Sequence, residues 1–197
     1  MKEYKVDRVE VLRYLGYRNQ KMSIELEDTI TSVIEECSSL ATPKYVYDFF
    51  DIEKWTPTVC LVGTKLVLEG DDIVVHLKNA EKCGVLATTL GVSVEKALLK
   101  YQSGDMTRAV ILDAVATTLI EAVTDECEAE IKMKAAALNL YTNFRYSPGY
   151  GDFPLEVQKS LVSAIFAEKR IGLTVTETSI LIPHKSVTAV IGLFKKP

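Results

Sequence analysis

The sequence has no apolar run of the ~18–20 residues that a membrane-spanning helix needs. Its first residues are charged and lack the apolar segment of a secretory signal. It also has no excess of basic residues: 23 Lys and Arg stand against 27 Asp and Glu, for a formal net charge of −4. A nucleic-acid-binding surface needs a basic stripe. We therefore expect a cytoplasmic protein that binds neither a membrane nor nucleic acid.

Cysteine is scarce, and no two cysteines form a CxxC pair. Such spacing does not build a local zinc site, and in a reducing compartment an isolated cysteine behaves as a small buried hydrophobic residue. We expect no metal site and four free thiols, at Cys37, Cys60, Cys83 and Cys127.

The first quarter of the chain has the periodicity of helices. Apolar residues recur at helical spacing over residues 7–17 and again over 23–41, where Ser23 is placed to cap a helix that stops before Pro43. We predict a small helical N-terminal preface, residues 1–42, ahead of a main domain over 43–197. The two are expected to form one compact unit.

From residue 44 onward, β-branched runs alternate with helical patterns. Strands are predicted over residues 44–50, 58–62, 65–68, 83–89, 173–175, 180–182 and 187–193. Helices are predicted over 71–79, from a cap at Ser93 to 103, over 106–140 and over 155–169. Strict strand–helix alternation is missing. We therefore predict an α+β fold with a largely antiparallel, twisted sheet packed with helices.

The segment 145–154 is the part of the sequence best suited to bind a ligand. Two glycines and two prolines give it an irregular backbone, which a flat ligand can approach closely. Arg145 offers a rigid fork for a carboxylate or phosphate. The alternative from composition alone is a rigid turn that carries a surface arginine.

Three blocks in this region resemble a known family. The run Arg145-Tyr-Ser-Pro-Gly-Tyr-Gly151 resembles the Arg-x-x-x-Gly-Tyr signature of the S-adenosylmethionine-binding activation domain of cobalamin-dependent methionine synthase. The segment from Leu173, Leu-Thr-Val-Thr-Glu-Thr-Ser-Ile-Leu-Ile-Pro-His-Lys-Ser-Val-Thr-Ala, is similar to the family's Leu-Thr-Glu-Ser…Pro-x-x-Ser-Val-Ser segment. Upstream, Leu119-Ile-Glu-Ala looks like the family's Leu-Ala-Glu-Ala stretch. The blocks occur in the family's order.

The resemblance implies a binding site for S-adenosylmethionine. By this resemblance Arg145 holds the ligand's carboxylate, and Glu121 assists on its amino or ribose side. The loop residues Pro148, Gly149, Tyr150 and Gly151 complete the site, with main-chain groups around the Gly-Tyr pair receiving the adenine. The resemblance implies no catalytic residue.

The sequence also departs from the family. Gly151 replaces the usual proline, Asn139 stands where a second acid is usual, and the N-terminal third matches poorly. The chain ends where the family's longer domain continues with a further aromatic contact, so we expect weaker ligand binding than in a fused domain.

The implied function is reactivation of vitamin B12-dependent methionine synthase, in methionine biosynthesis. The Asp-x-His-x-x-Gly motif of cobalamin-binding domains is absent from the sequence. We therefore expect a stand-alone component that binds S-adenosylmethionine for reductive methylation of cob(II)alamin on a partner synthase lacking its own activation domain. A flavodoxin- or ferredoxin-like protein would donate the electron. The alternatives are a regulatory S-adenosylmethionine-binding module and an activator of another corrinoid methyltransferase.

Several other residues receive structural interpretations. His76 is expected to be a structural histidine with satisfied hydrogen bonds, and His184 a solvated turn residue. Trp55 is expected in the core or an interface. Three aromatic residues of the loop, Tyr146, Tyr150 and Phe153, are predicted to contribute to an exposed surface that docks on a partner.

Overall fold

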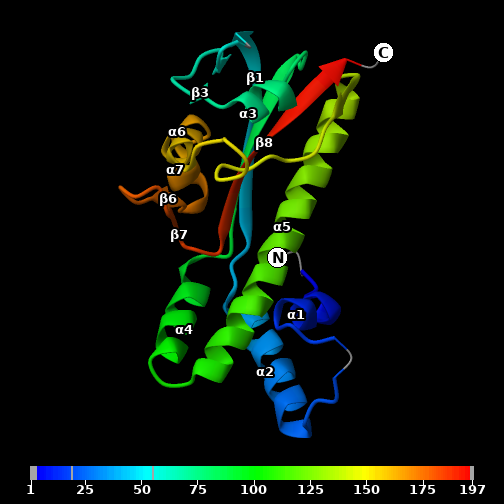
Figure 1. Ribbon diagram of the computed structural model, residues 1–197, viewed down its shortest axis with the longest axis vertical. Coiled ribbons are helices and arrows are strands. Elements are labelled where there is room, and N and C mark those ends of the chain that lie inside the picture. The colour runs from blue at the N-terminus through cyan, green and yellow to red at the C-terminus, as the bar shows by residue number, and fades with distance from the viewer. Residues whose placement is uncertain (1–3, 19, 55, 196–197) are drawn as a thin grey trace.

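The computed structural model describes residues 4–18, 20–54 and 56–195 (Figure 1). The helices are α1 (Arg8–Tyr14), α2 (Ile24–Leu40), α3 (Asp71–His76), α4 (Val92–Gln102), α5 (Met106–Ala137), α6 (Gln158–Ala164) and α7 (Ala167–Ile171). The strands are β1 (Lys44–Lys54), β2 (Val59–Leu61), β3 (Val67–Leu68), β4 (Lys82–Thr89), β5 (Leu140–Thr142), β6 (Thr174–Val175), β7 (Leu181–Ile182) and β8 (Ser186–Lys195).

A six-stranded sheet forms the centre of the molecule, in the order β3-β2-β1-β4-β8-β5, and every neighbouring pair is antiparallel. The long central strands pair in continuous register, from Lys44 opposite Thr89 to Asp51 opposite Lys82. Strands β6 and β7 form a separate two-stranded sheet. The predicted α+β class with an antiparallel sheet and helical packing is confirmed.

The sheet is buried on both faces, which explains why β4 is buried continuously from Cys83 to Thr89 rather than at alternate residues. Leu86 faces the long helix α5, where it packs with Cys127 and Ile131. Its neighbours Val85 and Ala87 face the opposite layer, which contains α6 and α7. The side chain therefore switches layer at each residue, as the period of a strand requires.

Helix α5 connects the two ends of the molecule. It spans 32 residues, and the side chain of Asp105 caps it by accepting a hydrogen bond from the amide of Arg108 at 3.0 Å. Its first half packs with α1, α2 and α4, and its second half lies against the sheet (Figure 1). The buried hydroxyls of Thr88 and Thr124, 2.9 Å apart, tie β4 to α5 where the two parts meet.

The predicted helical preface is present as α1 and α2. Ser23 caps α2 as expected, since its hydroxyl accepts from the amide of Leu26 at 3.3 Å. Both helices pack against α5, so their apolar faces are covered by the main body. A domain boundary between residues 42 and 43 stays a prediction. None of the helices in the described part of the chain is long and apolar enough to cross a membrane.

The single helix predicted over 155–169 is wrong. A short 3₁₀ turn, Leu155–Val157, leads into α6, and Phe166 adopts a left-handed conformation with φ of 52°, so that α7 begins at Ala167. A left-handed residue cannot continue a right-handed helix, so the direction of the chain changes there. Gly172, also left-handed, ends α7.

Two further boundaries differ from the prediction. Helix α4 begins at Val92 after Gly91, without a side-chain cap, so Ser93 lies inside the first turn. Helix α5 ends at Ala137, and the residues after it form β5, an unpredicted edge strand that pairs with β8. The apolar Leu140 fits the helical pattern in the sequence, which is why the helix was predicted to reach it. In the structure its backbone is extended because it pairs with β8.

Candidate functional site

The loop after β5 lies between α5 and the layer that contains α3 and α6 (Figure 1). Tyr146 anchors it to the sheet, because its backbone exchanges two hydrogen bonds of 2.9 Å with Val190 of β8. Further along, the amide of Gly149 donates to the carbonyl of Phe153 at 2.8 Å. Gly149 and Gly151 both have positive φ, 89° and 54°, which glycine adopts without strain. The loop is thus held in a defined turn against the sheet by its backbone hydrogen bonds.

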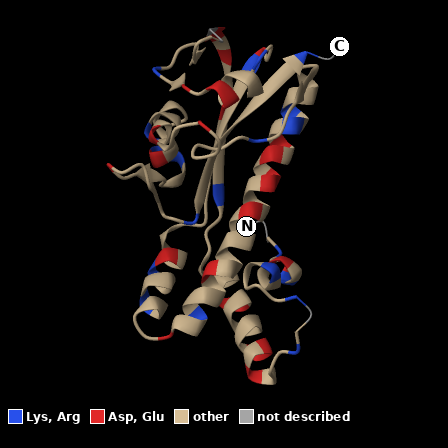
Figure 2. Ribbon diagram, in the orientation of Figure 1, with Lys and Arg blue, Asp and Glu red and all other residues tan. Residues whose placement is uncertain are grey.

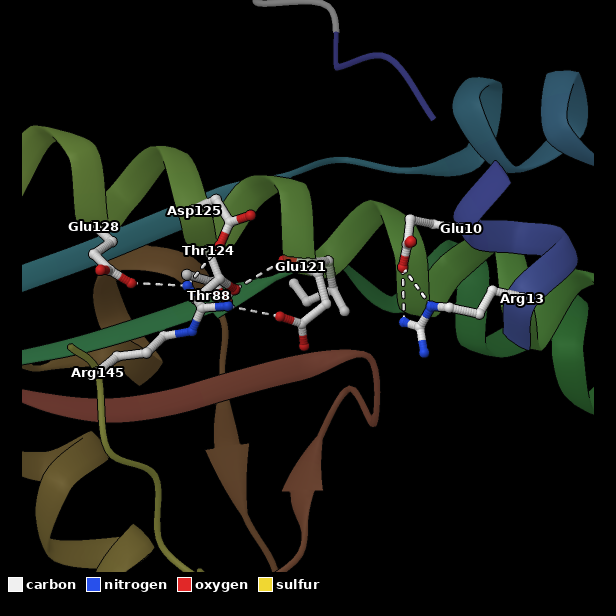
Figure 3. A network of polar contacts seen from close by, with 9 residues as sticks. Glu10, Arg13, Thr88, Glu121, Thr124, Asp125, Glu128 and Arg145 are labelled. Carbon is white, nitrogen blue, oxygen red and sulfur yellow. Dashed lines mark hydrogen bonds and ion pairs between the residues drawn. The ribbon is translucent and has the colours of Figure 1, made fainter. Parts of the chain in front are cut away.

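Arg145 reaches across from this loop to three carboxylates on α5 (Figure 3). Its Nη2 donates to Glu121 at 2.8 Å, and its Nη1 donates to Asp125 at 2.5 Å and to Glu128 at 2.8 Å. The three acids follow one another at spacings of four and three residues, which places them on one face of a helix. Figure 2 shows this acidic stretch along α5.

The charges of this cluster are unequal. Glu128 is nearly buried, with its side chain 10% exposed, and it also pairs with Lys132 at 2.6 Å. Burial alone would raise the pKa of Glu128, but the hydrogen bonds from Lys132 and Arg145 outweigh it and the pKa is lowered. Three carboxylates therefore share two cations, and an acidic surplus remains beside Arg145.

A hollow of about 470 Å³ opens beside this cluster. Its walls include four residues of the predicted site: Glu121, Arg145, Pro148 and Tyr150. The other walls come from the loop, the start of α6, β7 and β8, and are formed by Phe144, Tyr146, Ser147, Gln158, Leu181, Ser186, Val187 and Thr188. The predicted residues Gly149 and Gly151 lie in the same loop and set its turns. The structure brings the predicted set into one region.

The predicted aromatic docking surface needs a correction. Phe153 is only 1% exposed and belongs to the core between the sheet and α6, so it cannot contact a partner. Tyr146 is half-buried. Tyr150, 67% exposed, remains at the mouth of the hollow, and the exposed Phe144 lies there as well.

His76 is structural, but the prediction that its hydrogen bonds are satisfied is wrong. Its ring packs edge-on against Phe144 and stacked on Tyr146, with centroids at 4.8 and 5.1 Å. Its Nε2 is buried and has no hydrogen-bond partner among the described residues. Burial, the larger influence, lowers the pKa of His76 although a backbone hydrogen bond at Phe144 raises it.

The remaining interpretations are partly confirmed. Cys37, Cys83 and Cys127 are buried free thiols, whereas Cys60 is half-buried. His184 is largely exposed, as expected, and its Nδ1 lies 2.6 Å from Glu95. Trp55 lies outside the described residues.

Two acids of the cluster, Asp125 and Glu128, were not among the residues predicted from the sequence. The signal was available, because acids at 121, 125 and 128 repeat with the period of the predicted helix and so share a face with Glu121. What the sequence could not give was the partner, since Arg145 lies 17 residues beyond Glu128 and reaches it only through the fold.

The fold and the site together define a class of protein: an α+β domain with a hollow that pairs a cationic fork with acids and suits a small zwitterionic ligand. The family model for the vitamin B12 dependent methionine synthase activation domain matches residues 66–196. Because this match covers more than half of the chain, the chain belongs to that family.

A solved structure agrees with this assignment at the level of fold. It is described as "Crystal Structure of the MetH Reactivation Domain bound to AdoHcy", and it matches with a TM-score of 0.69 over 95% of this chain and 73% of that chain. At 14% sequence identity the likeness shows the fold alone. No curated protein matches the chain in sequence.

Proposed function

We propose that this chain binds S-adenosylmethionine in the hollow beside Arg145 and supplies its methyl group for reactivating a cobalamin-dependent methionine synthase. The observation that carries the proposal is the cluster of Arg145 and Glu121 in the wall of that hollow, within a chain of the activation-domain family. That the solved relative binds AdoHcy, the demethylated form of the same ligand, supports it.

The donors of Arg145 suit the carboxylate of an amino acid. A guanidinium has five N–H groups, and contacts with the three acids of α5 use three of them. Among the described residues, the Nε proton and the second Nη2 proton remain for a ligand carboxylate. Because the acids fix the plane of the guanidinium, it is oriented before the ligand arrives.

The acidic side of the cluster suits the ligand's positive charges. Glu121 lines the hollow and uses only one oxygen for Arg145, so the other can accept a hydrogen bond from the ligand's ammonium group. Tyr150, at the mouth, offers an aromatic face to the sulfonium cation. In this proposal the main chain around Pro148, Gly149 and Gly151 receives the adenine.

The contribution of this chain to methyl transfer would be binding and orientation. The sulfonium methyl would face a cobalamin carried outside these 197 residues, on a synthase that lacks its own activation domain. A flavodoxin- or ferredoxin-like donor would supply the electron. Holding the two reactants in line lowers the barrier to methyl transfer, because the entropy cost of bringing them together is met when they bind. We place this reaction in the cytoplasm.

The test is reconstitution with the partner synthase. The partner is first oxidised to cob(II)alamin, then given reductant and S-adenosylmethionine with or without this chain, and methylcobalamin is followed by its absorption. We expect methylcobalamin to return only when the chain is present. Equal recovery without the chain would refute a role in reactivation and leave a regulatory module or an activator of another corrinoid methyltransferase.

A further inference from the structure

Helix α3 is held at its C-terminal end by the residue that begins the ligand loop. The side-chain amide of Asn143 donates to the carbonyl of His76, the last residue of α3, at 2.8 Å. The same side chain accepts from the amide of Gly192 in β8 at 2.8 Å. Asn143 therefore fixes the end of α3 and the start of the loop to the sheet at one point.

The N-terminal end of α3 is held by Asp152, at the other end of the loop. The helix begins after Gly70, which has no side chain to cap it. Asp152 takes that place from a distance of 80 residues in sequence, since its carboxylate accepts from the amides of Asp71 at 2.5 Å and Asp72 at 3.1 Å. In return the Asp72 carboxylate accepts, at 3.4 Å each, from the amide of Asp152 and the hydroxyl of Tyr146. We call this two-ended attachment the α3 clasp, formed by Asn143, Tyr146 and Asp152 with Asp72 and His76.

Two glycines leave room for the clasp. A Cβ on Gly151 would lie 2.0 Å from the Asp72 carboxylate and 2.7 Å from the Tyr146 hydroxyl, and a Cβ on Gly70 would lie 2.7 Å from the Asp152 carboxylate. Both glycines also have positive φ, 54° and 121°. The proline typical of the family at position 151 would fix φ near −65° and fill this space. The departure from the family pattern at Gly151 therefore accompanies the contact with Asp72.

Aromatic packing joins the middle of the clasp to the wall of the hollow. The rings of Phe144 and Tyr146, both in that wall, pack on His76 of α3, and Tyr146 also stacks on the buried Phe153 with centroids 6.0 Å apart. The buried Nε2 of His76 gains no hydrogen bond from the described residues, so the ring is held by this packing and by a backbone hydrogen bond at Phe144. The segment between the two anchors, residues 144–151, contains the loop part of the candidate site.

We propose that α3 is the positioning element of the ligand loop, and that Asp152 and Asp72 set the affinity for the ligand without touching it. The inference rests on the proposed function for the identity of the ligand, S-adenosylmethionine. Because both ends of the loop are tied to one short helix, loosening either tie lets Arg145 and Tyr150 move relative to the acids of α5. Ligand binding, in turn, should tighten the clasp, since coupling between two sites is reciprocal.

The test compares Asp152→Ala with Asp71→Ala. Asp71 is the matched control, because it is an exposed acid in the same first turn whose backbone amide, rather than its carboxylate, meets Asp152. Calorimetry should show S-adenosylmethionine binding weakened about tenfold in Asp152→Ala and little changed in Asp71→Ala. Asp152→Asn keeps an acceptor oxygen and should recover part of the affinity. Equal affinities in wild type and Asp152→Ala, or equal losses in Asp152→Ala and Asp71→Ala, would overturn the proposal.

Hydrogen exchange supplies the readout that a general loss of stability would not mimic. In the wild type, S-adenosylmethionine should slow exchange at the amides of Asp71 and Asp72, and in Asp152→Ala that slowing should disappear. Should Asp152→Ala not fold, Asp72→Asn tests the same clasp from the other side. The coupling is contradicted if the ligand does not slow exchange at these amides in the wild type, or if it still slows exchange there in Asp152→Ala.

Failure of the proposed function can be distinguished from failure of the α3 clasp. If the wild type does not bind S-adenosylmethionine, the proposed function fails, and the clasp is tested without ligand. Exchange at the amides of Gly149 and Tyr150 should then be faster in Asp152→Ala than in the wild type and unchanged in Asp71→Ala. Unchanged exchange in Asp152→Ala would show that α3 does not position the loop.

Discussion

Two arginines interact with acids around α5, and they differ in what surrounds them. Arg108, near the start of the helix, donates to Glu36 of α2 at 2.9 Å and lies over the ring of Tyr101, with its side chain 26% exposed. Arg145, which contacts the middle of the helix, has a similar exposure of 25% but meets three acids. One arginine is matched with one acid, whereas the other stands among an excess of carboxylates in the wall of a hollow.

The difference separates a structural ion pair from the proposed binding site. The Arg108 group joins α2, α4 and α5, and its charges cancel. The Arg145 group keeps unused donors and unused acceptor oxygens in contact with open space, an arrangement that suits a ligand of mixed charge. Ion pairs at both sites perturb pKa values, so the perturbation alone does not identify the functional one.

The largest expected effect on stability comes from comparing two aromatic residues of the ligand loop, the buried Phe153 and the exposed Tyr150. Phe153→Ala should lower the free energy of unfolding by about 3–5 kcal/mol, because it empties a core position. Tyr150→Ala, at an exposed position of the same loop, should change it by about 0.5 kcal/mol or less. Urea denaturation measures both. Similar losses in the two variants would mean that the loop is not divided into a buried anchor and an exposed tip.

Arg108→Ala should destabilise the fold by about 1–2 kcal/mol, because Glu36 loses a charged hydrogen bond and two helices, α2 and α4, lose a contact with α5. The affinity of this variant for S-adenosylmethionine should stay at the wild-type value, since Arg108 lies near the start of α5 and does not line the hollow. Denaturation and calorimetry on the same sample check the two statements. A loss of affinity without a loss of stability would reverse the roles assigned to the two arginines.

Acid should weaken both groups. At Glu36, as at Glu128, burial raises the pKa, but the partners' hydrogen bonds outweigh it and the folded pKa lies below the ordinary value. A lowered folded pKa stabilises the native state above the unfolded pKa, roughly 4.3, and that stability is lost as the pH falls through the folded value. The free energy of unfolding should therefore fall as the pH is lowered from about 5 to 2.5. Glu36→Gln and Glu128→Gln should each make this dependence on pH less steep. Slopes identical to wild type would contradict both assignments.

The smallest effect is expected at Asp125. Its side chain is 66% exposed, so its contact with Arg145 is solvated, and Asp125→Asn should change the free energy of unfolding by about 0.5 kcal/mol or less. Chemical denaturation beside wild type resolves that difference. A loss above about 1.5 kcal/mol would place the Arg145 group with the structural ion pairs and remove the contrast with Arg108.

Local signals predicted most of the fold. Ser23 caps its helix as predicted, and the β-branched runs became the central strands. The prediction failed where distant contacts decide the backbone. Phe166 interrupts a predicted helix, and no glycine or proline in the sequence indicates the break. Leu140 fits a helical pattern in the sequence but pairs with β8 as a strand.

The candidate site was predictable in part for the same reason. The loop motif identified Arg145 and its neighbours, and a helical period could have added Asp125 and Glu128 to Glu121. The burial of Phe153 and the capping of α3 by Asp152 depend on contacts between segments about 80 residues apart, and composition and spacing do not encode such contacts.

The most direct test of the account is calorimetry of S-adenosylmethionine binding to wild type, Arg145→Ala, Arg145→Lys and Arg108→Ala. The wild type and Arg108→Ala should bind weakly but saturably. Arg145→Ala should lose about 1.5–3 kcal/mol of binding free energy, the scale of a charged hydrogen bond. Arg145→Lys should recover only part of it, since an ammonium cannot make the two-pronged contact. Wild-type affinity in Arg145→Ala, or no binding to the wild type at millimolar ligand with or without the partner synthase, would contradict the central claim.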